Sequence, residues 1–287
     1  MRTSIRNAGM MFLLAALAAP GCVAISGSDF KYLEREEKRF TTAGKPQVTL
    51  STFDGPIEIH PWDRPEVLVV VEKRGLNKDD IAPIVVRAEQ DGDRVSLDVT
   101  GSRERGGSFF GVNMRSAKLI VSLPAASDVN AKSGDGSITI ERVSGNVTAH
   151  TGDGSIRLYD VGGALNLDTG DGSIHVAGKL TALRARTGDG SVTVDAERGS
   201  SAAADWDITT GDGSVTVGLP DGFNAELDAH TGDGRIHLND VAVGDTSASD
   251  DGARRPRRTN TVRGRLGSGG KSVRIRTGDG SITLRRS

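Results

Sequence analysis

The chain has 287 residues, and its 36 Lys and Arg side chains stand against 38 Asp and Glu side chains, which leaves a net charge of −2 at pH 7. A nucleic-acid-binding domain usually carries a clear basic excess, so this balance argues against nucleic acid as a partner. The only cysteine is Cys22, which excludes a disulfide, a cysteine-based zinc cluster and a thiol nucleophile from the rest of the chain.

The first 21 residues have the three parts of a bacterial signal peptide: a basic start, an apolar segment over 10–19 and small residues before Cys22. The sequence Ala19-Pro20-Gly21-Cys22 resembles the lipobox of bacterial lipoproteins, in which the cysteine becomes the lipidated first residue. Leu is usual where Ala19 stands, and Pro20 is uncommon. We predict a signal peptide over 1–21, lipidation at Cys22 and a tether over 22–35. The alternative is secretion with an incidental cysteine.

No stretch after the signal peptide is long and apolar enough to cross a bilayer, so any membrane contact is expected to run through a lipid on Cys22. Two acyl chains are enough to hold a protein firmly on a membrane. The sequence therefore predicts a lipid-anchored protein of the bacterial cell envelope. We expect it at the outer membrane, on the periplasmic or the surface face.

Residues 36–125 show strand patterns without a regular period. Apolar side chains alternate from Val48 to Ile59, across a corner that retains Asp54-Gly55. The same alternation, or an apolar run, predicts further strands over 67–71, 84–88, 94–100 and 117–123.

Residues 126–287 repeat one six-residue motif, of which Thr151-Gly152-Asp153-Gly154-Ser155-Ile156 is a complete copy. Apolar residues alternate with polar ones on both sides of each copy, which is the period of a strand with one buried face. Each repeat thus predicts two strands joined by a Gly-Asp-Gly corner. The central aspartates of the copies are Asp135, Asp153, Asp171, Asp189, Asp212, Asp233 and Asp279.

This pattern predicts an all-β fold, a single-chain β-solenoid over 36–287 that resembles a parallel β-helix built from two-strand coils. A single coil cannot bury its own apolar row, whereas stacked coils bury one another's. We expect the coils to follow one another in chain order, with parallel strands throughout. We also expect the corner glycines to supply positive φ angles.

Stacked coils bring equivalent residues into columns. The aspartate column is read as solvated carboxylates bonded to their own turns, or alternatively as a run of Ca²⁺ sites, although the nonapeptide pattern of calcium solenoids is absent. Two hydroxyl columns flank it and are expected either to bond the corners or to contact glycan, or ice in a specialised case. They are Thr151, Thr169, Thr187, Thr210, Thr231 and Thr277, and Ser137, Ser155, Ser173, Ser191, Ser214 and Ser281.

The ladder is interrupted over 244–258 by a segment rich in Ser, Asp and Arg, which we predict to be a loop insertion because such a composition does not pack. It ends in a basic cluster of Arg254, Arg255, Arg257 and Arg258. These arginines either contact an anionic polymer or lipid headgroups, or belong to a solvated loop balanced by nearby aspartates.

An ordered set of features surrounds the repeats. It consists of Phe53-Asp54-Gly55-Pro56-Ile57, Trp62-Asp63 with a Val-rich strand, Leu123-Pro124-Ala125, the Gly-Asp-Gly-Ser-Ile coils and Gly267-Ser268-Gly269-Gly270. The set resembles the bacterial putative-adhesin family, a domain of unknown function built as a β-solenoid, over residues 36–287. The resemblance implies a repeat protein of the cell envelope, and it supplies no catalytic residues.

No catalytic or cofactor motif stands at the required spacing. Gly269-Gly270-Lys271-Ser272 lacks the first glycine of a phosphate-binding loop, because Arg265 occupies that place. The five histidines share no ligand spacing, and His150 and His230 occupy the same outward position of their coils. They are His60, His150, His175, His230 and His237. We expect no enzyme activity, no cofactor and no conventional metal site.

The sequence therefore favours a non-enzymatic, adhesin-like envelope lipoprotein that presents a repetitive surface to envelope glycan or protein. One alternative is a polysaccharide-active enzyme of the β-helix type, which needs clustered carboxylates that break the repeat. The other is a surface spacer stiffened by calcium, which predicts cation-dependent folding.

Overall fold

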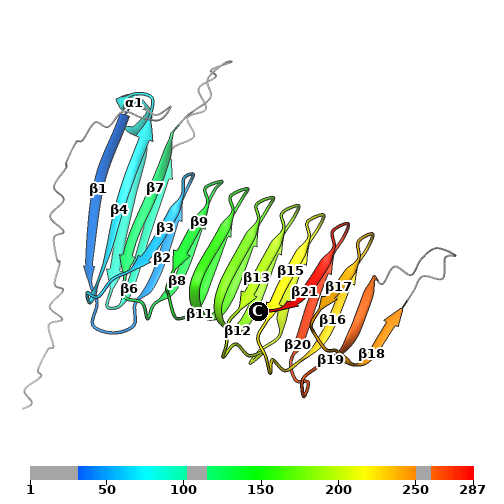
Figure 1. Ribbon diagram of the computed structural model, residues 1–287. Helices are drawn as coiled ribbons and strands as arrows, with labels where there is room; N and C mark the ends of the chain where they lie inside the picture. The colour runs from blue at the N-terminus through cyan, green and yellow to red at the C-terminus, as the bar shows by residue number, and fades with distance from the viewer. Residues whose placement is uncertain (1–31, 102–114, 250–259) are drawn as a thin grey trace, which may run out of the picture.

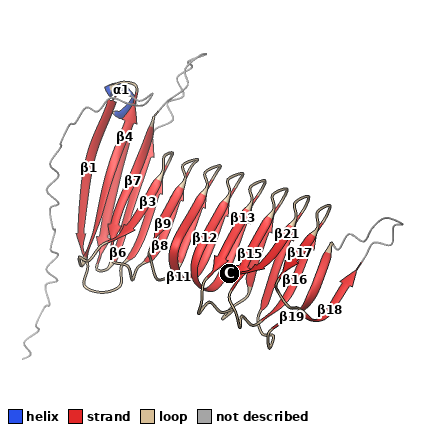
Figure 2. Ribbon diagram, in the orientation of Figure 1, coloured by secondary structure: helices blue, strands red, loops and turns tan. Residues whose placement is uncertain are grey.

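The computed structural model of the chain describes residues 32–101, 115–249 and 260–287, which form an elongated stack of strands (Figure 1). The helical part of these residues is the single turn α1 (Lys78–Ile81) (Figure 2). The predicted all-β solenoid is confirmed.

Eight coils make up the body of the stack. Each coil has one strand on one face of the stack, called face I, then a corner, then one strand on the opposite face, called face II. In each pair below, the first strand lies on face I and the second on face II. In spatial order the coils are β2 (Gln47–Thr52) with β3 (Ile57–Pro61), β8 (Asp128–Ser133) with β9 (Ile138–Glu141), β10 (Val147–Thr151) with the first half of β11 (Ile156–Thr169), the second half of β11 with the first half of β12 (Ile174–Thr187), the second half of β12 with β13 (Val192–Ala196), β14 (Trp206–Thr210) with β15 (Val215–Leu219), β20 (Ser272–Thr277) with β21 (Ile282–Arg286), and β16 (Ala225–Thr231) with β17 (Ile236–Asn239).

The expectation of coils in chain order is wrong near the C-terminus. The coil formed by β20 and β21 lies between the β14–β15 coil and the β16–β17 coil. On face I, Val273 is the register partner of both Trp206 and Leu227. On face II, Ile282 pairs with both Val215 and Ile236. Because every coil carries the same corner and the same inward aliphatic pattern, any coil fits beside any other.

The expectation of parallel strands throughout is wrong at both ends. Beyond the β2–β3 coil lie β6 (Arg94–Gly101) and β7 (Ser116–Leu123), which pair in parallel with β2 and β3. Antiparallel strands then cover them: β5 (Ile84–Asp91) on face I, and β4 (Glu66–Gly75) and β1 (Tyr32–Thr41) on face II. The strand β1 begins inside the range predicted for the tether.

At the other end, β19 (Thr261–Leu266) and β18 (Gly244–Ser249) extend face I with two antiparallel strands. The predicted loop over 244–258 is therefore wrong for residues 244–249. Their polar composition does not prevent a strand here, because strand pairing at a sheet edge is made by backbone groups.

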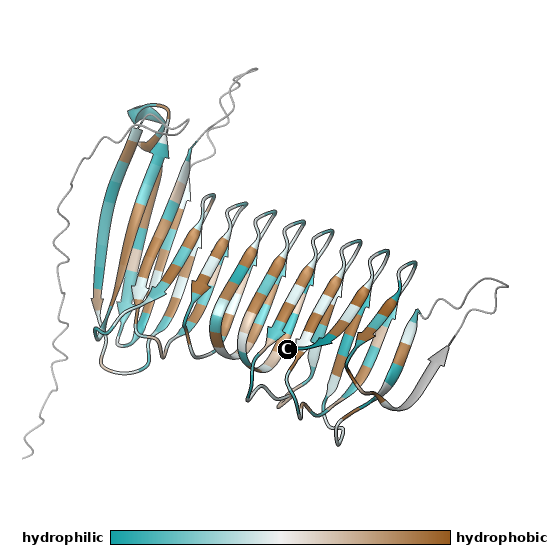
Figure 3. Cartoon of the chain, in the orientation of Figure 1, coloured by the Kyte–Doolittle hydropathy of each residue, from teal (hydrophilic) through white to brown (hydrophobic). Residues whose placement is uncertain are grey.

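The core is a continuous row of aliphatic side chains between the two faces. Hydropathy alternates along the strands of the coils (Figure 3), and the inward residues, such as Ile156, Leu158 and Leu167, are fully buried. Each such side chain contributes about 1.5–3 kcal/mol on burial. Trp206 is the largest buried side chain, and its ring meets that of Phe223 edge-on at 5.1 Å between centroids.

Candidate interaction surface

The threonine of each corner points into the stack and not toward solvent. The period-two alternation of β10 continues from Ala149 to Thr151, which places the threonine on the buried side. Its hydroxyl donates to the carbonyl oxygen of the second corner glycine in the neighbouring coil, at 2.7–2.8 Å in all six coils. All six threonines are buried, so the threonine column bonds the corners and has no surface to offer a glycan.

The corner glycines are required for close approach of backbones. A Cβ atom added at Gly172 would overlap the carbonyl oxygen of Gly154 one coil away, and the equivalent glycines of the other repeats meet the same obstacle. Among the corners, positive φ occurs at Gly55 (125°). The prediction of positive φ is otherwise wrong for the Gly-Asp-Gly corners. It holds at the opposite turn of the coil, where Gly163 has φ 116°.

The aspartate column forms along this edge, with one carboxylate for each coil. Asp54 joins the seven predicted residues, six of the seven follow the predicted order, and Asp279 stands between Asp212 and Asp233. The seven predicted carboxylates are exposed. Burial, and then the charge of Asp135, raise the pKa of Asp54 above its ordinary value. In the described part of the chain, no three His, Cys, Asp or Glu side chains converge as ligands of one metal ion.

The serine column is partly or fully exposed, next to the aspartates. Its hydroxyls take part in backbone contacts between coils: Ser214 Oγ accepts from the amide of Ser281 at 3.3 Å, and Ser281 Oγ accepts from the amide of Arg235 at 3.4 Å. This edge therefore presents a carboxylate and a hydroxyl group at six of the eight coils, while Pro56 and Arg235 stand in place of the serine in the other two. Coils are spaced by about 4.8 Å, the distance between neighbouring strands.

Face I carries a ladder of alternating charge that sequence reasoning missed. Arg184, Asp207, Arg274, Asp228 and Arg263 occupy one row on five successive strands. Asp228 pairs with Arg276 of the neighbouring row at 2.6 Å and with Arg263 at 3.1 Å. Hydrogen bonds from Arg276, opposed by burial and aided by Arg263, lower the pKa of Asp228. Opposite charges on adjacent strands stabilise pairing, so we interpret this ladder as structural.

Three histidines take surface partners, and for His150 and His230 this agrees with the outward position that the sequence predicts. His150 lies 3.0 Å from Asp168, His230 lies 2.8 Å from the hydroxyl of Thr261, and His60 lies 3.4 Å from Glu141. The lipidation candidate Cys22 and the basic cluster of Arg254, Arg255, Arg257 and Arg258 lie outside the described residues.

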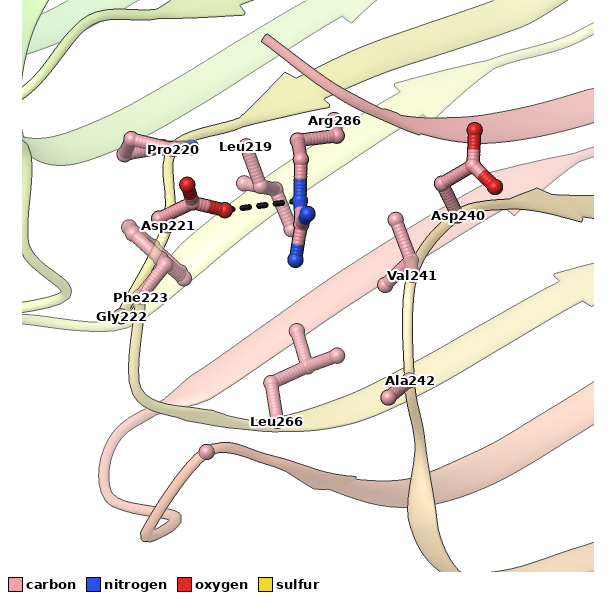
Figure 4. A pocket seen from close by; sticks show the side chains of 11 residues that line it. Leu219, Pro220, Asp221, Gly222, Phe223, Asp240, Val241, Ala242, Leu266 and Arg286 are labelled. Carbon is pink, nitrogen blue, oxygen red and sulfur yellow. Dashed lines mark ion pairs between the residues drawn. The ribbon is translucent and has the colours of Figure 1, made fainter.

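A cavity of about 170 Å³ opens at the edge opposite the aspartate column, between the ends of β15, β17, β19 and β21 (Figure 4). Its wall is apolar, with Leu219, Phe223 and Leu266. An ion pair crosses it, from Arg286 Nε to Asp221 Oδ1 at 2.7 Å, and Asp240 lies on the other side of Arg286.

None of the helical residues that the structure describes forms a segment with the length and apolar character of a transmembrane helix.

Comparison with known proteins identifies a family and two distant folds. The family model described as Toastrack DUF4097 matches residues 46–285. A putative cell adhesion protein from Clostridium sporogenes is similar over 89% of this chain and 100% of its own, with 14% identity and a TM-score of 0.42. A putative adhesin from Bacteroides fragilis is similar over 88% of this chain and 97% of its own, with 11% identity and a TM-score of 0.34. No curated protein matches the chain.

Proposed function

Since the chain belongs to the Toastrack DUF4097 family, whose matched region spans the whole stack of coils, we propose that it is a non-enzymatic scaffold of the cell envelope that presents a repetitive surface for adhesion or for contacts with other envelope components. The supporting observation is the register of its eight coils. Equivalent outward positions recur at every coil, while the inward positions are filled mostly by aliphatic groups. Such a stack is a long, stiff surface, the usual use of solenoid proteins.

The proposed attachment is a lipid on Cys22, followed by a short tether that leads to β1. The signal-like segment before Cys22 supports it, and the expected location is the outer membrane. Metabolic labelling with a palmitate analogue should mark the wild-type protein and not the Cys22→Ser variant, and the variant should leave the membrane fraction. An unlabelled wild-type protein that is soluble after fractionation would contradict the anchor.

Attachment assays test the proposed role directly. Cells that lack the protein should adhere less to a surface, or release envelope material more readily, than cells that express it. Expression of the full chain should restore the wild-type behaviour, whereas the Cys22→Ser variant should not. Equal adhesion and equal envelope integrity in all three strains would overturn the proposed function.

A polysaccharide-active enzyme is the second candidate, and the cavity in Figure 4 is where it would act, because Asp221 and Asp240 both line it. The ion pair with Arg286 already engages Asp221. Incubation with acidic and neutral polysaccharides should release no new reducing or unsaturated ends. Release that disappears in both the Asp221→Asn and the Asp240→Asn variants would establish the enzyme instead.

A calcium-stiffened spacer is the third candidate. We expect thermal unfolding, followed by circular dichroism, to be unchanged by Ca²⁺ or by chelator. A large rise in melting temperature with Ca²⁺, absent in the Asp171→Asn variant, would make the aspartates ligands. The proposed contact between anionic polymer and the basic cluster predicts that replacing Arg254, Arg255, Arg257 and Arg258 with serine weakens binding to acidic polysaccharide, most strongly at low salt.

A further inference from the structure

One part of face II departs from the repeat. Across the stack, one outward row holds threonine at Thr139, Thr193, Thr216 and Thr283. Glu58 and His237 replace it in the two outermost coils, and Arg157 and His175 replace it on the adjacent strands β11 and β12. In the next outward row no residue recurs, and Tyr159 is its tyrosine; the other coils carry His60, Glu141, Ala177, Asp195, Gly218, Arg285 and Asn239. Departures from a repeat are the places where a solenoid surface acquires a specific role.

The backbone is irregular at the same place. The pairing of β11 with β12 shifts register between Leu158 and Val161, so Tyr159 and Asp160 form a bulge. Asp160 has a φ of 53°, which L-residues seldom adopt, but the equivalent Arg142 (49°) and Asp240 (58°) share it, so the bulge and not this angle is particular to β11. A bulge bends its strand and re-aims a side chain. Here the ring of Tyr159 lies against His175, with 5.4 Å between centroids and 47° between planes.

Tyr159 is the exposed aromatic side chain of the described residues, with 39% of its surface accessible. Polar groups stand on one side of it. Glu141 is its register partner on β9, and Glu141 in turn lies 3.4 Å from His60 on β3. Both polar side chains keep more than a third of their surface exposed. On the other side of Tyr159, the short side chain of Ala177 projects little from the sheet surface.

We propose that Tyr159, His175, Glu141 and His60 form a binding site for a segment of a glycan chain, with one pyranose unit on the ring of Tyr159. The apolar C–H face of a pyranose packs on an exposed aromatic ring, and its hydroxyls donate to a carboxylate and bond to imidazole nitrogens. The site extends along the stack over four strands, about 14 Å at the usual strand spacing, so neighbouring sugar units of the same chain lie over adjacent coils. This assignment rests on the proposed function and names the ligand class that the surface contacts.

Titration of the purified protein with soluble oligosaccharides tests the site, by calorimetry and by saturation-transfer NMR. The probes are chains of neutral hexoses, of N-acetylated amino sugars and of uronic acids. We expect at least one to bind, and the Tyr159→Ala variant to bind it at least about tenfold more weakly, a loss of about 1.4 kcal/mol. Tyr159→Phe should retain binding, because the ring supplies the contact.

The matched control is Asn239→Ala, which truncates the equivalent outward position of the last coil. It should bind like the wild type, and circular dichroism should show every variant folded. If Tyr159→Ala binds as tightly as Asn239→Ala, the site is wrong.

The binding experiment and the cell experiment distinguish an error in the glycan site from an error in the proposed function. A wild-type protein that binds none of the oligosaccharides, in cells whose adhesion depends on it, overturns the site and leaves the proposed function standing. Oligosaccharide binding that depends on Tyr159, in cells whose adhesion and envelope do not change without the protein, supports the site and overturns the proposed function.

Discussion

The hydroxyl of Thr169 donates to the carbonyl oxygen of Gly154 in the neighbouring coil at 2.8 Å. The same arrangement recurs at every later corner, so the coils are joined by side-chain bonds as well as by strand pairing. Since the threonine is buried, the bond is shielded from water.

Replacing Thr169 with valine keeps the shape of the side chain and removes the donor. We expect the free energy of unfolding to fall by about 1–2 kcal/mol, because the carbonyl oxygen of Gly154 loses a partner in a buried place. Thr193→Val, on the outward side of β13, should change it by less than about 0.5 kcal/mol. Urea unfolding followed by circular dichroism gives both values, and equal effects would show that the corner bond contributes nothing.

Gly172→Ala should be far more disruptive than Gly162→Ala. The added Cβ at Gly172 meets the backbone of the next coil, which cannot move without parting the strands, whereas a Cβ at Gly162 has 3.7 Å to its nearest neighbour. We expect Gly172→Ala to cost more than about 4 kcal/mol, or to prevent folding. Gly162→Ala should stay within about 1 kcal/mol of the wild type. Thermal unfolding of the two proteins compares them directly.

Glu72 should stabilise the fold fully above its ordinary pKa of 4.5 and lose this effect progressively at lower pH. Burial raises the pKa of Glu72, but hydrogen bonds from Arg74 and Arg35 outweigh burial and hold it below that value. A lowered pKa in the folded state means that the stabilisation is present above pH 4.5 and is lost as the pH falls through the folded-state value. Glu72→Gln should cost about 1–3 kcal/mol at pH 7. The difference from wild type should shrink on acidification.

For Asp54 we expect the opposite dependence of stability on pH. Burial and the charge of Asp135 raise its pKa above the ordinary 3.8, so its contribution to stability falls as the pH rises from that value through the folded-state pKa. Asp54→Asn should therefore be more stable than the wild type at pH 7 and equal to it in acid. Denaturant titrations from pH 3 to pH 7 measure both variants, and parallel curves for Glu72→Gln and Asp54→Asn would contradict these assignments.

Engineered disulfides distinguish the observed coil order from the order of the chain. Thr216 and Thr283 are register partners on adjacent strands, as are Thr283 and His237. In a Cys22→Ser background, cysteines at either pair should oxidise. Cysteines at 216 and 237 would lie two strands apart, with their backbones separated by about 9.6 Å, which is too far for a disulfide, so this pair should not oxidise. A fast 216–237 disulfide, seen by mobility on non-reducing gels, would mean that the coils stack in chain order.

The alternation of aliphatic and polar residues was enough to predict most of the strands, their buried sides and the columns, but not β18 or the start of β1. It did not predict the position of the β20–β21 coil, because the coils share one inward pattern and their exchange leaves the core unchanged. The antiparallel direction of the strands at the ends was missed for a related reason. Period-two alternation shows which side of a strand is buried and says nothing of the direction of its neighbour.

The candidate sites likewise include features that the sequence could predict and features that it could not. The burial of the corner threonines could have been predicted from the sequence, since Thr151 continues the inward series of Val147 and Ala149. The role of the corner glycines could not have been predicted, because the close approach of their backbones depends on how the coils stack. The Tyr159 site depends on a bulge, and a single extra residue in one strand leaves no mark on the pattern of its neighbours.

The placement of β20 and β21 also governs the order in which the stack can assemble during synthesis. Coils from β8 to β13 contact neighbours that emerge next to them in sequence, so each can join the stack as it leaves the ribosome. The β16–β17 coil has to wait for residues 272–286, because only these connect it to β14 and β15. Until then its apolar residues lack their neighbours in the stack, and this part of the chain is the one that most needs protection from aggregation during folding.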